Sequence, residues 1–203
     1  MYKHTIPSSA ARPLLVRALL AAAVWAAASA SPAWAQADAK LVPAQSDIQF
    51  TSRQMGVPVD GKFRKFDAQV AFDPKKPETA RIGLTIDLAS ISLGAPESEA
   101  EVVKPLWFNT AKFPQASFQS TTVKPTGAGK FDVAGKLTIK GQARDVVVPV
   151  ALAQAGGTTT ATGAFTIKRG DFKIGEGEWA DTSMVANDVQ VKFKLQLTGI
   201  GAL

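Results

Sequence analysis

Carboxylates are the side chains of this sequence with the clearest capacity for chemistry. Three glutamates alternate within residues 97–101, and two more flank the glycine of residues 176–178. Paired carboxylates can serve as general acid and base in hydrolysis. The same spacing is typical of a solvated helix face or an exposed turn, and we favour that interpretation. A carboxylate-dependent hydrolase stays an alternative, and its candidate acids would be Glu97, Glu101, Glu176 and Asp171.

Other catalytic and metal-ligating side chains are nearly absent. The 203 residues include 0 cysteines and 1 histidine, His4. Disulfides, thiolate nucleophiles and thiolate metal sites are therefore excluded. Without a histidine beyond position 4, the chain has no Ser-His-Asp triad and lacks the usual ligands for zinc, copper and haem. We therefore expect no catalytic residue, no metal site and no cofactor, and we favour binding without catalysis.

The N-terminal segment has the pattern of a secretory signal. Lys3, Arg12 and Arg17 precede an uncharged apolar run over residues 18–30, and residues 33–35 read Ala-Trp-Ala. A basic start, a short apolar run and a small-residue cleavage site predict a cleaved signal peptide over residues 1–35 and a periplasmic domain over residues 36–203. Cleavage removes three positive charges from the formal net charge of +6. This weakens the case for a nucleic-acid partner. An uncleaved anchor helix is the alternative.

The elements that must position any site are predicted to be mainly strands. Ile82, Leu84, Ile86 and Leu88 alternate with smaller or polar residues. This period of two predicts a strand with one buried face. Similar patterns occupy residues 48–52, 68–72, 131–139, 146–152, 165–168 and 189–197. Many such segments between turn residues predict an antiparallel barrel or sandwich.

Residues 96–104 differ, because a first-turn proline, early acids and a final lysine predict a short helix. Aromatic residues follow it, including Trp107, Phe108, Phe113 and Phe118. A phenylalanine-rich interior suits either a dense core or a long apolar cavity, and the pattern does not separate the two. Residues 62–66 mix basic and aromatic side chains, which we interpret as a charged outer face over buried rings.

The chain from about residue 41 to residue 197 resembles the YceI-like proteins, also called the polyisoprenoid-binding YceI family. The resemblance rests on the order and spacing of several blocks. These blocks are SDIQF at 46–50, GKF at 61–63, VAFDP at 70–74, IDLASI at 86–91, WFN at 107–109, FPxAxFxS at 113–120, GKLTIKG at 135–141 and RGDF at 169–172. The sequence departs from common members at Gln54, where a histidine is frequent, and in the acidic stretch 97–101, where Arg-Asp is usual.

The resemblance implies an all-β fold, an eight-stranded antiparallel lipocalin-like barrel with one short helix beside it. It also implies a non-catalytic carrier whose apolar tunnel holds a long isoprenoid lipid, either a polyprenyl phosphate or a quinone-type tail. The residues expected to line the tunnel are Phe50, Leu84, Ile86, Leu88, Trp107, Phe108, Phe113, Phe118 and Phe193. A head group would meet Arg53, Lys62 or Arg169, although Arg169 and Asp171 could instead pair and fix a turn.

The expected partners are the isoprenoid lipid and, transiently, the inner membrane or a membrane cytochrome, but no nucleic acid. Whether the protein forms a homodimer stays open. A second hypothesis is that the protein is a lipid-free interaction module with a filled barrel, which partners a membrane cytochrome or a stress-response system. A hollow interior favours the carrier, and a filled one favours the module.

Overall fold

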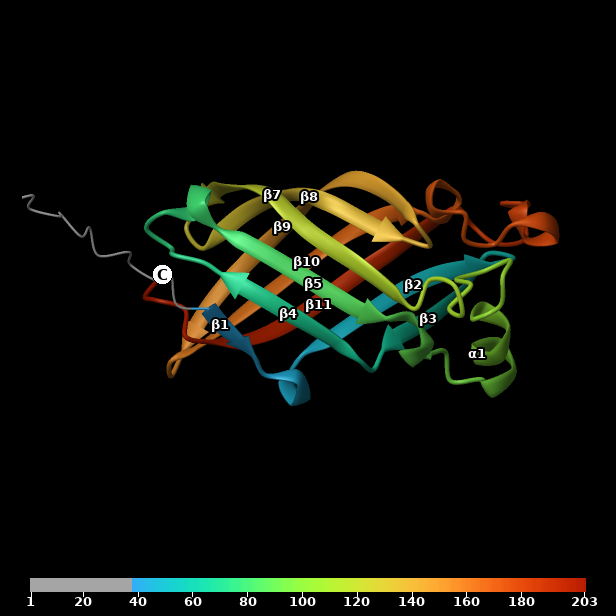
Figure 1. Cartoon of the computed structure of the whole chain (residues 1–203), viewed down its shortest axis with the longest axis horizontal. Helices are drawn as coiled ribbons and strands as arrows, with labels where there is room; N and C mark the ends of the chain where they lie inside the picture. The colour runs from blue at the N-terminus through green and yellow to red at the C-terminus, as the bar shows by residue number, and fades with distance from the viewer. Residues whose placement is uncertain (1–37) are drawn as a thin grey trace, which may run out of the picture. The chain divides into compact units, whose positions relative to one another are not determined.

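The computed structural model describes residues 38–203, which form a β-barrel with one short α-helix (Figure 1). The signal peptide predicted over residues 1–35 lies outside the described residues. The strands are β1 Asp38–Leu41, β2 Asp47–Gln54, β3 Val57–Phe63, β4 Phe66–Ala71, β5 Arg81–Asp87, β6 Ile91–Ser92, β7 Gln115–Gly127, β8 Lys130–Ile139, β9 Gln142–Ala155, β10 Thr158–Lys168 and β11 Asp188–Thr198. The α-helix is α1 Pro96–Val102, and short 3-10 turns include η3 Leu88–Ser90, η4 Arg169–Phe172 and η5 Gly177–Ala180.

Eight antiparallel strands close the barrel, in the order β1-β4-β5-β7-β8-β9-β10-β11, with β11 pairing back onto β1. The long β11 makes this closure at its C-terminal end, where Thr198 faces Lys40. Its N-terminal half instead pairs with β2, which β3 and β6 extend. The fold is therefore the predicted barrel and not a sandwich.

Alternation along the long strands β8 and β11 separates an apolar interior from a polar exterior. In β11, Leu195 and Leu197 are buried, whereas Lys192 and Lys194 between the inward positions are exposed. In β8, alternate residues from Phe131 to Ile139 are buried. Successive strand side chains point to opposite faces of a sheet, so these strands turn an apolar face to the interior.

Two strands depart from the pattern that the sequence analysis relied on. The register between β7 and β8 shifts between Ser120 and Thr122, opposite Gly135, so the buried positions of β7 change phase. Strand β3 carries Pro58 and Gly61, residues that usually argue against a strand. Leu88, expected at the end of a strand, instead begins η3.

Helix α1 ends at Val102 and lies at the end of the barrel reached by the β2–β3 hairpin (Figure 1). The segment that follows β10, with η4 and η5, reaches the same end. No helix within residues 38–203 is long and apolar enough to cross a membrane. The one α-helix of the described residues and the long β10–β11 connection thus lie at a common end of the barrel.

Candidate functional site

The barrel encloses an apolar cavity of about 360 Å³. Side chains from the strands of the wall line it, most of them valine, leucine, isoleucine and phenylalanine. The lining runs from Phe72 and Ile200, near the chain's C-terminal end, to Val102 and Trp107 beside α1. The phenylalanine-rich interior therefore surrounds a space and is not a filled core.

Three phenylalanines lie against strand glycines, which keeps their rings close to the wall. Phe193 pairs directly across the sheet with Gly163, and Phe50 pairs with Gly61 in the same way. Phe118 covers Gly135. A Cβ atom on any of these glycines would lie less than 3.0 Å from the phenylalanine ring. Each ring therefore occupies space that a side chain would otherwise fill, and the centre of the barrel stays open.

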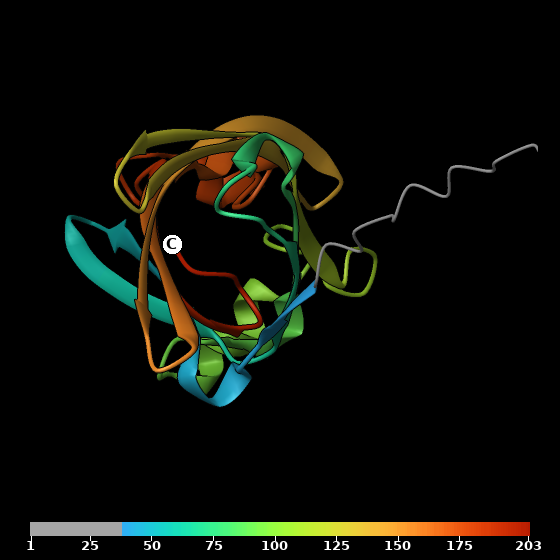
Figure 2. The ribbon, with the colours of Figure 1, turned by 90° about the vertical axis from the view of Figure 1, so that its left-hand side faces the viewer.

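The end of the cavity near β1 is closed by packed apolar side chains. The rings of Phe72 and Phe131 meet edge to face with centroids 5.2 Å apart. Ile200, beyond β11, is buried in the same cluster. The amide of Gln154 donates to the carbonyls of Ile200 and Gly201 at 3.2 and 3.1 Å, which holds the C-terminal segment across this end (Figure 2).

The opposite end of the cavity carries the polar lining residues. Gln54 at the end of β2 and Ser98 in α1 line the cavity and are exposed. Glu101, also in α1, lines it too and accepts a hydrogen bond from Lys104 Nζ at 2.5 Å. This polarity and exposure indicate that the cavity opens beside α1.

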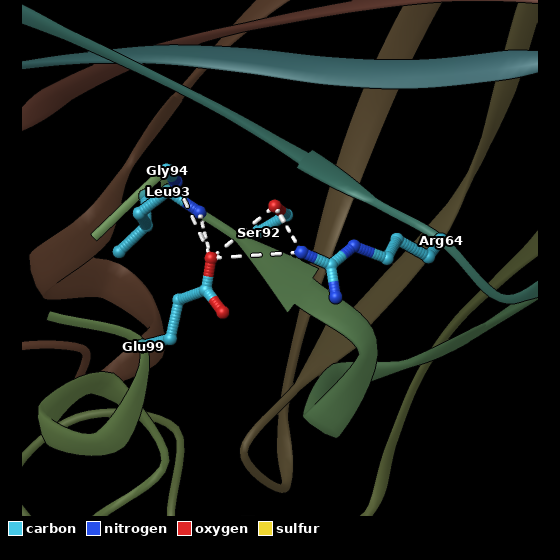
Figure 3. A network of polar contacts seen from close by, with 5 residues as sticks. All are labelled: Arg64, Ser92, Leu93, Gly94 and Glu99. Carbon is cyan, nitrogen blue, oxygen red and sulfur yellow. Dashed lines mark hydrogen bonds and ion pairs between the residues drawn. The ribbon is translucent and has the colours of Figure 1, made fainter. Parts of the chain in front are cut away.

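Helix α1 is held at this opening by one carboxylate (Figure 3). Glu99 Oε1 accepts hydrogen bonds from the backbone N–H groups of Leu93 and Gly94 at 2.9 and 3.3 Å, and from Ser92 Oγ at 3.2 Å. Arg64 of the β3–β4 turn lies 3.7 Å from the same oxygen. The pKa of Glu99 is lowered from its ordinary value, chiefly because the Leu93 N–H binds the ionised carboxylate and further because Ser92, Arg64 and Gly94 favour the charged form; partial desolvation opposes this.

A buried arginine organises the segment between β10 and β11. Arg169 is 3% exposed, and its guanidinium donates to four backbone carbonyls. Nη1 binds Ile174 and Gly175 at 2.9 Å each, and Nη2 binds Val185 at 2.7 Å, while Nε donates to Ala186 at 3.1 Å. Burial lowers the pKa of Arg169. The expected alternative pairing with Asp171 is not seen among the ion pairs of the described residues, so Arg169 fixes this segment through carbonyls.

A second cation fastens the same segment to the barrel wall. Lys140, at the β8–β9 turn, is 6% exposed and has a left-handed backbone with φ of 49°. Its Nζ donates to the carbonyl of Lys173 at 2.7 Å and to Glu176 at 2.9 Å. Residues 169–187 between β10 and β11, which we call the covering segment, are therefore tied to the β8–β9 hairpin.

Two tryptophans from distant parts of the chain meet at the opening. Trp107, after α1, and Trp179, in η5, have ring centroids 5.4 Å apart and are tilted by 48°. Both line the cavity. Their indole N–H atoms are buried and have no hydrogen-bond partner among residues 38–203. Sequence reasoning named Trp107 but missed Trp179, whose isolated position in a turn gave no pattern to detect.

Most residues expected to line a tunnel do line this cavity. They are Phe50, Leu84, Ile86, Leu88, Trp107, Phe108, Phe118 and Phe193. Phe113 lies elsewhere: it is half-buried against Gly141 of the β8–β9 turn, with Lys112 Nζ 5.4 Å from its ring centroid. It precedes β7, so the strand alternation does not direct it inward. Whether the lining residues bind a ligand stays a prediction.

The three cations expected at a head group lie in separate places. Arg53 is exposed near the end of β2 and donates to the carbonyl of Gly56 at 3.3 Å. Lys62 is exposed on β3 and lines a separate surface recess with Asp47, Arg64 and Lys65. Of the three, Arg169 alone lines the cavity.

The acids of the hydrolase alternative are dispersed or paired with lysines. Glu101 binds Lys104 and Glu176 binds Lys140, whereas Glu97 and Asp171 are exposed. Within residues 38–203, no three His, Cys, Asp or Glu side chains gather in a way that could hold a metal ion. The arrangement can thus enclose an apolar guest, and its polar groups mainly fasten α1 and the covering segment.

Comparison with solved structures places this barrel among known ones. The crystal structure of Burkholderia cenocepacia BcnA superimposes with a TM-score of 0.75 at 46% sequence identity, covering 77% of this chain and 99% of that chain. A polyisoprenoid binding domain from Saccharophagus degradans gives a TM-score of 0.66 at 16% identity, covering 81% of this chain and 99% of that one. The second likeness, at this identity, concerns the fold alone.

Sequence relatives point the same way. The Escherichia coli O157:H7 protein YceI is 34% identical over 96 residues, which is 47% of this chain and 50% of that protein. A UPF0312 protein of Azotobacter vinelandii is 36% identical over 88 residues, 43% of this chain and 46% of the relative. The chain thus spans about half the length of these relatives. The sequence profile of the YceI-like domain matches residues 40–197, and the chain therefore belongs to the YceI-like domain family.

Proposed function

We propose that this protein is a non-catalytic carrier that holds the chain of a long isoprenoid lipid in its barrel. The observation that carries the proposal is the apolar cavity of about 360 Å³, closed near Phe72 and polar beside α1. A lipid chain would lie along the cavity with its head at the α1 end. The polyisoprenoid binding domain of similar fold supports this class of guest.

The physical chemistry of burial favours a hydrocarbon guest. Removing one CH₂ group from water is worth about 0.8 kcal/mol, so a five-carbon isoprene unit gains roughly 4 kcal/mol on entering an apolar cavity. The free energy of the lipid chain changes little on transfer from a bilayer to this cavity, because both surroundings are hydrocarbon. A carrier with such a cavity can therefore both take up and release its guest. With the signal peptide expected over residues 1–35, we place this carrier in the periplasm, where it would meet the membrane only transiently.

Substitution of Ile86 by tryptophan tests the proposal. Ile86 lines the cavity and packs against both apolar clusters of the barrel, so a larger ring there obstructs the middle of the cavity. We expect Ile86→Trp to lose at least tenfold in affinity for a fluorescent prenyl-chain probe, with the melting temperature changing little. Val147→Trp is the matched control, because Val147 is exposed on the outer face of β9.

Equal binding by both variants and the unchanged protein would show that the probe does not use the cavity. In that case the carrier proposal fails, and the lipid-free interaction module becomes the favoured function.

A further inference from the structure

Exposed apolar side chains gather at the end of the barrel where the cavity opens. Six large apolar side chains of residues 38–203 are exposed. Two of them lie elsewhere, Val147 on the outer face of β9 and Leu203 beyond β11. The other four, which we call the apolar rim, belong to segments that reach the α1 end (Figure 1) and are Met55, Val57, Leu106 and Met184. None of the four lines the cavity, so a guest inside it does not account for them.

Backbone hydrogen bonds join the segments that carry the apolar rim. The N–H of Met55 donates to the carbonyl of Met184 at 2.8 Å, which joins the β2–β3 turn to the covering segment. The carbonyl of Leu106 accepts hydrogen bonds from the N–H groups of Gly175 and Glu176 at 2.9 and 2.8 Å, which joins the residues after α1 to the same segment. The rim residues are therefore held at one end of the barrel.

The tip of the β2–β3 hairpin has an apolar side chain where its backbone favours a polar one. Met55 and Gly56 are the two residues between the strands, and both have left-handed φ values, 49° and 80°. Such two-residue turns favour Asn or Asp before Gly, and most other side chains are strained there. Met55 is nonetheless 70% exposed, and a Cβ on Gly56 would meet nothing within 4 Å. Packing does not explain this methionine, which indicates a role outside the fold.

Backbone polar groups at this tip are already bonded within the protein. The Met55 N–H is bound by the Met184 carbonyl, and Arg53 Nη1 donates to the carbonyl of Gly56 at 3.3 Å. Moving an unpaired backbone group into an apolar phase is costly. These hydrogen bonds therefore lower the cost of placing the tip in an apolar phase.

The charges near the apolar rim offset one another. Arg53 beside the tip and Lys173 in the covering segment are exposed cations, whereas Glu178 and Asp181 of the covering segment are exposed acids. An anionic surface would attract the first pair and repel the second. A contact at this end therefore depends on the apolar side chains and not on net charge.

We propose that the apolar rim docks this protein on a neutral lipid bilayer, with Met55 and Val57 inserted among the headgroups. This inference rests on the proposed carrier function and adds the place at which the carrier meets the membrane. The cavity opens beside α1, at the end of the barrel that carries the rim. An isoprenoid chain that crosses water exposes hydrocarbon at a cost, and a rim seated in the bilayer removes that cost.

The test measures how the protein, purified from its own cells, binds phosphatidylcholine vesicles in a flotation assay. Val57→Ser and Val147→Ser are a matched pair, because the two valines are 63% and 60% exposed and only Val57 belongs to the rim. We expect Val57→Ser to lower the partition coefficient about three- to tenfold, and Val147→Ser to change it by less than about twofold. Binding of the unchanged protein should persist at high salt, because exposed charges are then screened.

Met55→Asn separates docking from folding. Asparagine adopts a left-handed backbone more readily than methionine, so the melting temperature should stay the same or rise. Vesicle binding should nevertheless fall about as far as in Val57→Ser. Because neither residue lines the cavity, both variants should keep their affinity for a water-soluble prenyl probe, while the rate of probe transfer from vesicles falls.

The outcomes separate this docking surface from the carrier function. If the unchanged protein binds the prenyl probe but not the vesicles, or if Val57→Ser weakens vesicle binding no more than Val147→Ser, the docking surface is overturned and the carrier stands. In the first case, a dimer that dissociates in Val57→Ser would assign the rim to a second copy of the chain.

Vesicle binding that requires anionic lipid and is lost at high salt also overturns the docking surface. If the variants lower vesicle binding as expected but no prenyl probe binds the unchanged protein, the bilayer contact stands and the carrier proposal fails.

Discussion

At the scale of single residues, the opening of the cavity depends on two charged groups that each make several hydrogen bonds. Glu99 accepts hydrogen bonds from the backbone N–H groups of Leu93 and Gly94. Arg169 donates hydrogen bonds to four backbone carbonyls of the covering segment. Hydrogen bonds to an ionised partner are stronger than neutral ones, so each group fixes several backbone positions at once. These polar contacts therefore help to hold α1 and the covering segment in place, and buried Phe172 and Ile174 add apolar packing to the covering segment.

The attachment of α1 should therefore depend on pH. The pKa of Glu99 is lowered in the folded protein, so its stabilising contribution is present above the ordinary value of 4.5 and is lost as the pH falls through the lower, folded-state pKa. We expect the amide resonances of Leu93 and Gly94 to titrate together with a midpoint below 4.5 in an NMR pH series. In Glu99→Gln this transition should disappear. A midpoint at or above 4.5 would show that these amides do not bind the carboxylate.

Single residues were also where sequence reasoning succeeded least. Alternation in β11 and β5 correctly directs Phe193 and Ile86 inward, because a strand's period is independent of its surroundings. Phe113 and Trp179 lie in connections, where no period constrains the side chain. Arg169 belongs to the RGDF block, but nothing in the sequence indicates that its guanidinium binds backbone carbonyls and not the carboxylate of Asp171. Such partners follow from tertiary structure alone.

At the scale of elements, the hollow interior follows from pairing aromatic residues with glycines on neighbouring strands. Phe50 of β2 covers Gly61 of β3, and Phe193 of β11 covers Gly163 of β10. The sequence shows both residue types but not their register across strands. For this reason the strands could be predicted, whereas the choice between a filled core and a cavity could not. Strand β7 could not be predicted from alternation either, because its bulge breaks the period of two.

Adding a methyl group beneath one of these rings should disturb the cavity. In Gly61→Ala the new Cβ would lie under 3.0 Å from the Phe50 ring and from Leu93, both side-chain groups, so the ring must move toward the interior. We expect the free energy of unfolding to fall by about 1–3 kcal/mol, as for other overpacked sites, and the affinity for a prenyl probe to fall several-fold. Chemical denaturation and probe titration measure the two effects.

Gly127→Ala is the control for that prediction, because its Cβ would meet only the Lys130 side chain, 3.9 Å away. It should change neither quantity appreciably. Unaltered prenyl binding by Gly61→Ala would mean that the Phe50 ring does not set the width of the cavity.

At the scale of the whole barrel, the two ends of the cavity differ in a way that orients a guest. One end is closed by Phe72, Phe131 and Ile200, and the other carries Ser98 and Glu101 beside α1. A lipid with one polar end gains most when its tail reaches the closed end and its head stays near the polar opening, because burying an unpaired polar group is costly. The barrel therefore predicts a single orientation of the lipid.

Photo-crosslinking tests this orientation. A prenyl probe with a photoreactive group at its tail should label peptides containing Phe72, Phe131 or Ile200. The same group placed beside the head should label residues 96–108 or η5. Peptide mass spectrometry after digestion locates the labels. Reversed labelling, or equal labelling of both ends by each probe, would refute a fixed orientation.

The central claim, that the barrel's cavity holds an isoprenoid chain, is tested most directly by native mass spectrometry of the full-length protein purified from its own cells. We predict a stoichiometric mass increment whose extracted lipid fragments in five-carbon steps, and its loss in Ile86→Trp. A protein that carries no lipid, or that carries the same lipid with the cavity obstructed, would contradict the account.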